Sequence, residues 1–138
     1  MRLLLDTDVL LDVAMAREPF GPDSRSVLHW CHDSPHSAVL AWHTVANLYY
    51  LIAGARNDGV ARQFISGLLD FSEIASTGKA AVRHALTLRM RDFEDALQVA
   101  AALSADVQFI VTRNLSDYRG SPLPAITPRE FIKRFLKT

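Results

Sequence analysis

The sequence predicts an α/β fold built on a mostly parallel sheet. Short apolar runs alternate along the chain with longer segments of helical period. Strands that alternate with helices usually pair in parallel, with the helices packed on the faces of the sheet. No repeat, low-complexity tract or linker interrupts the 138 residues, the length of one ordinary domain. We therefore expect a single domain over residues 1–138.

The N-terminal third predicts one strand and two helices. Arg2–Leu5 is a short apolar strand, and Val9–Ala14 has the spacing of an amphipathic helix with Asp8 as its N-cap. Pro19 and the glycine that follows end this segment, and a second helix is expected over Asp23–Cys31.

The middle of the chain predicts a strand, two helices, a strand and a helix. The apolar run Ala38–Ala41 is typical of a buried strand, and Thr44–Ala55 and Val60–Phe71 have helical apolar faces. A short strand is expected at Glu73–Ser76, followed by a helix over Lys79–Met90.

The C-terminal third predicts a helix over Phe93–Ser104 and a clear strand at Gln108–Thr112. A short extended piece is expected at Ala125–Ile126. Thr127 then caps a last helix that has Pro128 at its first position and continues through Leu136.

Composition narrows the class of protein. The formal net charge is zero, with 49% hydrophobic and 22% charged residues, as in soluble globular proteins. No apolar stretch is long enough to span a bilayer, and acidic residues come too early in the chain for a signal peptide. The single cysteine, Cys31, excludes an internal disulfide framework. We therefore expect a cytoplasmic protein with no membrane association.

Five acidic residues stand at the ends of apolar segments: Asp6 after the first strand, Asp92, Glu94 and Asp95 at a helix start, and Asp117 after the last clear strand. Parallel α/β sheets build their sites at the carboxyl edge, where such side chains would meet. Gathered carboxylates repel one another unless a cation compensates them, and hard divalent ions prefer oxygen ligands. A Mg²⁺ or Mn²⁺ site is the first hypothesis.

These acids differ in their expected roles. Asp95 precedes the largely apolar run 96–102, a helix expected to be buried, so it is the preferred ligand of the trio. Asp92 has the position of a helix cap, and Asp92 and Glu94 are the secondary candidates for ligands. Asp12 is expected to face solvent.

Thr112 and Asn114 place a hydroxyl and an amide near Asp117. Such groups can orient a metal-bound water or a carboxylate, although ordinary turn chemistry also accounts for them.

Two other classes of site are compatible with parts of the sequence. Asp6-Thr7-Asp8 resembles the nucleophile motif of haloacid-dehalogenase-like phosphatases, but Lys79 is the only lysine before the last helix and no Gly-Asp pair occurs. Histidines 29, 32 and 36 lie around Cys31 without the spacing of a closed zinc site.

The stretches 4–12, 92–98 and 110–118 together resemble the PIN-domain ribonucleases, and the VapC-type toxins of toxin–antitoxin pairs in particular. The resemblance implies a three-layer α/β/α sandwich around a mostly parallel sheet. It also implies a Mg²⁺- or Mn²⁺-dependent endoribonuclease in which a metal-activated water attacks RNA phosphodiester bonds. A homodimer and a small antitoxin protein are the implied partners.

The resemblance implies that Asp6 and Asp95 are catalytic acids that would bind the metal, with Asp117 serving in place of the acid that the family usually has at Asn114. Asp92 is a further expected metal ligand. Glu94, Thr112, Asn114 and Asn47 would support them. Asn47 and Asn114 stand where the family usually has acids, so each keeps an oxygen ligand and loses a charge. A weak or inactive module that binds RNA or protein is therefore the alternative function.

Overall fold

The computed structural model describes residues 1–136, so Lys137 and Thr138 of the expected domain lie outside the described residues. The strands are β1 (Leu3–Leu5), β2 (Ala38–Leu40), β3 (Ser72–Ile74), β4 (Phe109–Val111) and β5 (Ala125–Ile126). The helices are α1 (Thr7–Ala14), α2 (Gly21–Asp33), α3 (Trp42–Ala55), α4 (Asp58–Leu69), α5 (Lys79–Thr87), α6 (Phe93–Ser104) and α7 (Pro128–Phe131). Within residues 1–136, none of the helices has both the length and the apolar character needed to cross a membrane.

The five strands form one parallel sheet in the order β3-β2-β1-β4-β5, which confirms the predicted sheet. The central strand β1 pairs with β2 through Leu3 and Ala38 and with β4 through Leu5 and Val111. Because β1 and β4 are in register, the residues that follow them emerge side by side at the carboxyl edge. Asp6 and Thr112 are those residues.

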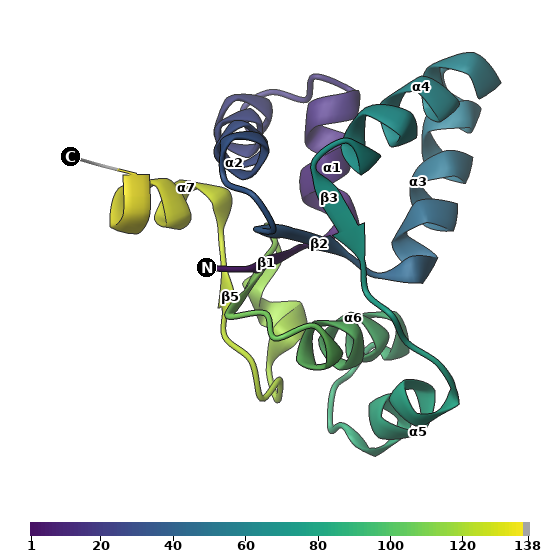
Figure 1. Ribbon diagram of the computed structural model, residues 1–138, viewed down its shortest axis with the longest axis vertical. Coiled ribbons are helices and arrows are strands. Elements are labelled where there is room, and N and C mark those ends of the chain that lie inside the picture. The colour runs from purple at the N-terminus through teal and green to yellow at the C-terminus, as the bar shows by residue number, and fades with distance from the viewer. Residues whose placement is uncertain (137–138) are drawn as a thin grey trace.

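Helices cover both faces of the sheet (Figure 1). Helices α1 to α4 lie on one side, and α5 and α6 lie on the other. The alternation of side chains along β1 separates two cores, since Leu3 and Leu5 pack with α1 and α2 residues while Leu4 packs with Val99 of α6. The expected three-layer α/β/α sandwich is confirmed.

Several predicted element bounds are off by one or two residues; the strand expected at Glu73–Ser76, for example, is Ser72–Ile74. Two helix ends differ more. The helix expected to reach Met90 ends at Thr87, because Leu88 has an extended backbone at φ −74° and ψ 136°. The last helix does not continue uniformly to its end: α7 stops at Phe131, and residues Ile132–Leu136 form a wider π turn.

Two predictions about the acids of α1 are also wrong. Asp6 and not Asp8 caps α1, because Asp6 has the extended backbone of an N-cap and its carboxylate accepts a hydrogen bond from the Thr7 amide at 2.7 Å. Asp12 does not face solvent and is fully buried. Asp8 and Asp12 lie on the side of α1 that faces the end of β4, where Arg113 and its neighbours contact them.

Candidate metal centre

A polar cavity of about 530 Å³ opens at the carboxyl edge of the sheet. The junction of β1 with α1 forms one wall, and the start of α6 forms the other. Its lining residues include most of the acids singled out in the sequence, together with two arginines: Asp6, Thr7, Asp8, Leu11, Arg17, Arg91, Asp92, Glu94, Asp95, Asn114 and Asp117.

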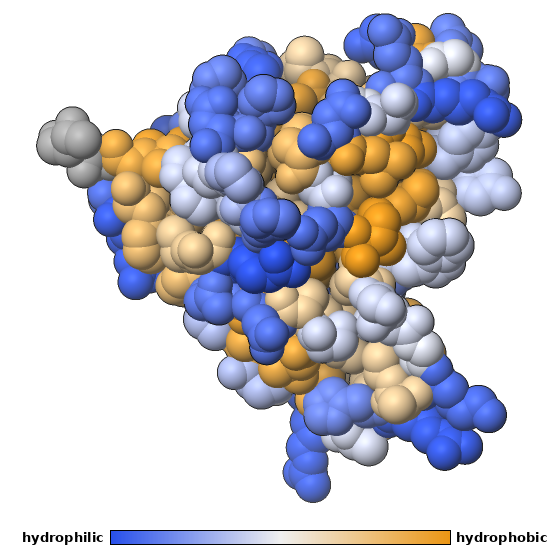
Figure 2. All heavy atoms as spheres, in the orientation of Figure 1, coloured by the Kyte–Doolittle hydropathy of each residue, from blue (hydrophilic) through white to orange (hydrophobic). Residues whose placement is uncertain are grey.

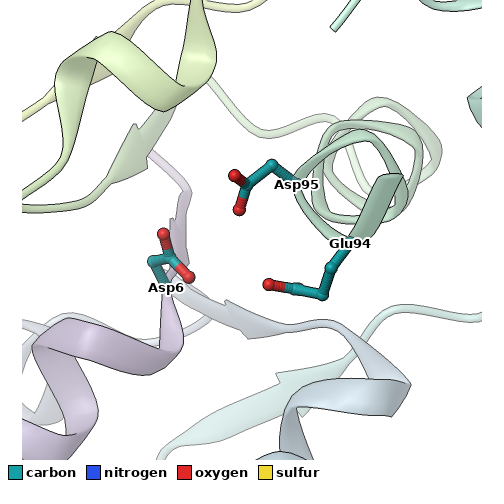
Figure 3. Close-up of side chains that lie close together, drawn as sticks. All are labelled: Asp6, Glu94 and Asp95. Carbon is teal, nitrogen blue, oxygen red and sulfur yellow. The ribbon is translucent and has the colours of Figure 1, made fainter. Parts of the chain in front are cut away.

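Three carboxylates converge in this cavity. Asp6, Glu94 and Asp95 each contribute one oxygen to a cluster in which all three oxygens lie within 4.8 Å of one another. Figure 3 shows Asp6 reaching from the end of β1 towards the two acids from the first turn of α6. We call these residues the three-acid cluster. Residues far apart in the sequence meet here because β1 is central in the sheet and α6 packs directly against it.

The Asp6 carboxylate is held by three hydrogen bonds. Besides the Thr7 amide, Gln98 Nε2 donates to Oδ1 at 3.1 Å and the Tyr118 hydroxyl donates to Oδ2 at 2.9 Å. Only 7% of Asp6 is exposed. Burial raises the pKa of Asp6 above its ordinary value, and the hydrogen bond from Tyr118 opposes that rise. The side chain is therefore fixed and costly to ionise.

The first turn of α6 presents the other two acids. Asp92 is the N-cap of α6 and accepts a hydrogen bond from the Asp95 amide at 3.1 Å, so the predicted cap is confirmed. The pKa of Asp95 is raised to about 8, first by burial and then by the charges of Asp6 and Glu94. The Glu94 carboxylate accepts a hydrogen bond from His43 Nε2 of α3 at 2.6 Å.

Asp8 lies beside the cluster but faces the loop after β4. Its Oδ2 accepts hydrogen bonds from the Thr112 hydroxyl at 3.1 Å, the Arg113 amide at 3.1 Å and Asn114 Nδ2 at 3.0 Å. Burial, followed by the charge of Asp6, raises the pKa of Asp8 to about 6. Within residues 1–136, the buried Oδ1 of Asp8 has no hydrogen-bond partner.

Asp12 is compensated by a cation of the protein itself. The Arg113 guanidinium donates to both carboxylate oxygens, and the Nη2–Oδ1 distance is 3.2 Å. The same guanidinium lies over the Phe20 ring, 4.0 Å from its centroid. We call Asp8, Asp12 and Arg113 the Arg113 group.

The structure brings together most of the residues singled out in the sequence, although in unequal ways. Asp6 and Asp95 lie in the three-acid cluster, and Glu94 joins them. Asp92 and Asp117 line the same cavity outside the cluster, and Asp117 Oδ1 lies 3.6 Å from Arg91 Nη2. Thr112 and Asn114 hold Asp8, as described above. Asn47 is half-buried on α3 and does not line the cavity.

Four residues that the sequence reading missed also shape the site: Gln98, Tyr118, His43 and Arg113. Gln98 had a usable signal, because it is the one polar side chain in the apolar run 96–102 and a buried amide needs a partner. Arg113 stands in a loop, His43 at a helix start and Tyr118 at the end of the short 3-10 helix Leu115–Tyr118, where polar and aromatic residues are common without any role in a site.

The chemistry of the three-acid cluster suits a hard divalent cation. All its donors are carboxylate oxygens, the ligand type that Mg²⁺ and Mn²⁺ prefer. Within residues 1–136 no lysine or arginine forms an ion pair with Asp6, Glu94 or Asp95. Ionised together, the three acids would repel one another, and a bound cation would relieve that repulsion.

Comparison with known protein families identifies the family of the chain. The model of the PIN domain matches residues 2–116, which covers the sheet edge and all three acids of the cluster. The chain belongs to the PIN-domain family. This confirms the resemblance on which the expected fold and site were based. Among curated proteins, no sequence matches this PIN domain.

Solved structures of toxin–antitoxin proteins share the fold at low sequence identity. VapBC2 from Rickettsia felis, bound to a promoter DNA fragment, matches with a TM-score of 0.73 at 15% identity, covering 92% of this chain and 98% of that chain. A toxin–antitoxin complex from Klebsiella pneumoniae matches with a TM-score of 0.70 at 20% identity over 91% and 97%. VapC20 from Mycobacterium tuberculosis, a toxin that cleaves the sarcin–ricin loop, matches with a TM-score of 0.63 at 14% identity over 78% and 86%.

Proposed function

We propose that this PIN domain is a metal-dependent endoribonuclease, with residues 1–138 acting as one domain. The observation that carries the proposal is the convergence of Asp6, Glu94 and Asp95 in an open polar cavity, where no lysine or arginine of residues 1–136 forms an ion pair with them. Burying several carboxylates together is unfavourable, and such sites are typical of functional centres. The PIN-domain family then favours a nuclease over the phosphatase that Asp6-Thr7-Asp8 also resembles.

Asp6, Glu94 and Asp95 are the proposed ligands of Mg²⁺ or Mn²⁺. Asp92 and Asp117 add negative charge at the rim of the same cavity, where they can bind through water or help to hold a second ion. When bound, the ion would stabilise negative charge on the phosphate and lower the pKa of a nucleophilic water.

The residues of the chain supply positioning and substrate binding. Gln98 and Tyr118 fix the Asp6 carboxylate, so the ligand does not need to be ordered when the ion binds. Arg17 and Arg91 line the cavity beside the acids, and the Arg91 side chain is 85% exposed. We infer that these two arginines contact phosphates of the RNA on either side of the scissile bond. Thr112 and Asn114 act more remotely, because they hold Asp8 of α1 against the loop after β4.

The biological role proposed is that of the toxin in a toxin–antitoxin pair. Support comes from the shared fold with VapBC proteins and with VapC20, which cleaves the sarcin–ricin loop. The partners proposed are an RNA substrate and a small antitoxin protein, and the proposed location is the cytoplasm.

A homodimer is proposed through the outer face of α3 and α4. Trp42, Tyr50 and Leu51 of α3 are 73%, 75% and 50% exposed, which is high for large apolar or aromatic side chains. Figure 2 shows hydrophobic side chains gathered on the face over α3, α4 and β3. A second copy of the chain would remove this surface from water.

The test is cleavage of diverse RNAs by the purified protein with Mg²⁺ or Mn²⁺ and with a chelator. Asp6→Asn and Asp95→Asn should each lower the cleavage rate about 100-fold or more, because each removes charge where the ion binds. Asp70→Asn is the matched control, since Asp70 is an exposed acid at the end of α4, outside the cavity.

Three other results of this experiment would each indicate a different function or a different site. Full cleavage by both site variants would show that the reaction occurs elsewhere. A wild-type protein that binds neither divalent ion and leaves every RNA intact would identify a binding module in place of an enzyme. A covalent aspartyl-phosphate formed during turnover would indicate phosphatase chemistry.

A further inference from the structure

Glu94 reaches the three-acid cluster while bonded to a side chain of the opposite helical layer. His43, in the first turn of α3, donates from Nε2 to Glu94 Oε2 at 2.6 Å, because an ionised carboxylate can only accept. The two side chains are 27% and 40% exposed, so this pair is partly withdrawn from solvent. The bond engages Oε2, and within residues 1–136 no hydrogen bond reaches Oε1, which can therefore bind an ion.

Asn47 lies one turn after His43 on α3, at the position where the resemblance places an acid. Asn47 does not line the cavity, and within residues 1–136 its side chain makes no hydrogen bond to the three acids. Helix α3 therefore reaches the site through its first turn. The next residue of that turn, Thr44, donates to Gln98 Oε1 at 3.4 Å, and Gln98 in turn donates to Asp6.

We propose that His43 is a positioning residue of the metal centre. It holds Glu94 in place as a ligand, and Glu94 then supplies the carboxylate that is absent at Asn47. This inference rests on the proposed function, because it requires that the three-acid cluster bind a divalent ion. Residues that hydrogen-bond to a ligand typically contribute 10- to 100-fold to metal affinity. Glutamate has a longer side chain than aspartate, so without His43 it has more conformations to lose on binding.

Calorimetric titration of the metal-free protein with Mn²⁺ alone tests this role without RNA. His43→Phe removes the donor and should weaken Mn²⁺ binding about 10-fold or more. His43→Gln keeps an N–H donor on a flexible side chain and should restore part of the affinity. His36→Phe is the matched control, because His36 forms a similar pair with Glu73 at 2.9 Å, on the surface and away from the cavity.

Repeating the His43→Phe titration in a Glu94→Gln protein distinguishes loss of Glu94 positioning from a general loss of structure. If His43 acts through Glu94, His43→Phe should cause little further loss of Mn²⁺ affinity in that background. An equal loss in both backgrounds, or an unchanged affinity in His43→Phe, would overturn the proposal for His43 while leaving the metal site intact. A wild-type protein that binds no Mn²⁺ would overturn both proposals. Binding of Mn²⁺ without any RNA cleavage would overturn only the proposed function.

Discussion

Two groups of acids lie at the same edge of the sheet, and their charges are compensated in opposite ways. In the Arg113 group, the fully buried Asp12 accepts two hydrogen bonds from the Arg113 guanidinium. In the three-acid cluster, no arginine or lysine of residues 1–136 pairs with the carboxylates, and the pKa of Asp95 rises to about 8. Burial of an acid therefore does not by itself mark a site; burial without a matching charge does.

The comparison also separates stability from function. A buried ion pair is costly to break, because removing one partner leaves the other charge without compensation. A cluster of like charges is already unfavourable, and removing one member relieves the others. Substitutions in the two groups should therefore change the free energy of unfolding in opposite directions.

The largest effect is expected from Arg113→Ala. It leaves the Asp12 carboxylate buried with only a weak contact to Arg17 and should lower the free energy of unfolding by about 3–5 kcal/mol. Urea denaturation followed by circular dichroism measures this change. A loss below about 1 kcal/mol would mean that Asp12 is neutral or solvated in the folded protein, and the contrast with the cluster would disappear.

Asp95→Asn should have the opposite sign in metal-free protein. Near pH 7 the wild-type protein must either keep the Asp95 charge in a crowded group or take up a proton to neutralise it, and Asn avoids both costs at nearly the same side-chain size. The free energy of unfolding should therefore rise on the order of 1–2 kcal/mol after allowance for solvent screening. Thermal denaturation in chelator measures it. Excess Mn²⁺ should reverse the order, because wild type gains binding energy that the variant lacks. Destabilisation of the metal-free variant would refute the repulsion argument.

A smaller effect concerns pH. Asp95 binds its proton more tightly in the folded protein, with a pKa of about 8, than in the unfolded chain, where the ordinary value is 3.8. The stability that this proton contributes is complete at low pH and is lost as pH rises through about 8. Metal-free protein should therefore become less stable from about pH 4 to about pH 8, and Asp95 should cause no further loss above that. Asp95→Asn should remove most of that dependence, and an identical slope in both proteins would assign it to other groups.

The smallest effect is expected from Arg17→Met. Arg17 is the second arginine near Asp12, but its Nη1 lies 4.0 Å from Oδ1 and its side chain is 46% exposed. A pair of this kind contributes about 0–1 kcal/mol, so denaturation in urea should barely distinguish the variant from wild type. A loss as large as that of Arg113→Ala would mean that the two arginines share the compensation of Asp12 equally.

The fold and the gathering of the acids at one sheet edge could be predicted from local sequence, whereas the partners of each acid could not. Apolar runs and turn residues located β1 to β5, and acids at strand and helix ends located the edge where they meet. The roles of Asp8 and Asp12 were wrong because they depend on where Arg113 lies, 101 residues beyond Asp12. Tyr118 and His43 were missed for the same reason, since only the packing of layers brings them to Asp6 and Glu94.

The three-acid cluster joins the two helical layers of the sandwich. Asp6 belongs to the junction of β1 with α1 on one face, and Glu94 and Asp95 belong to α6 on the other (Figure 1). An ion held by all three would act as a cross-link across the end of the sheet. Its binding energy would then oppose separation of the layers, and amide hydrogens of α6 would exchange more slowly with solvent. A divalent ion would thus stabilise the packing of the two helical layers in addition to its role in the reaction.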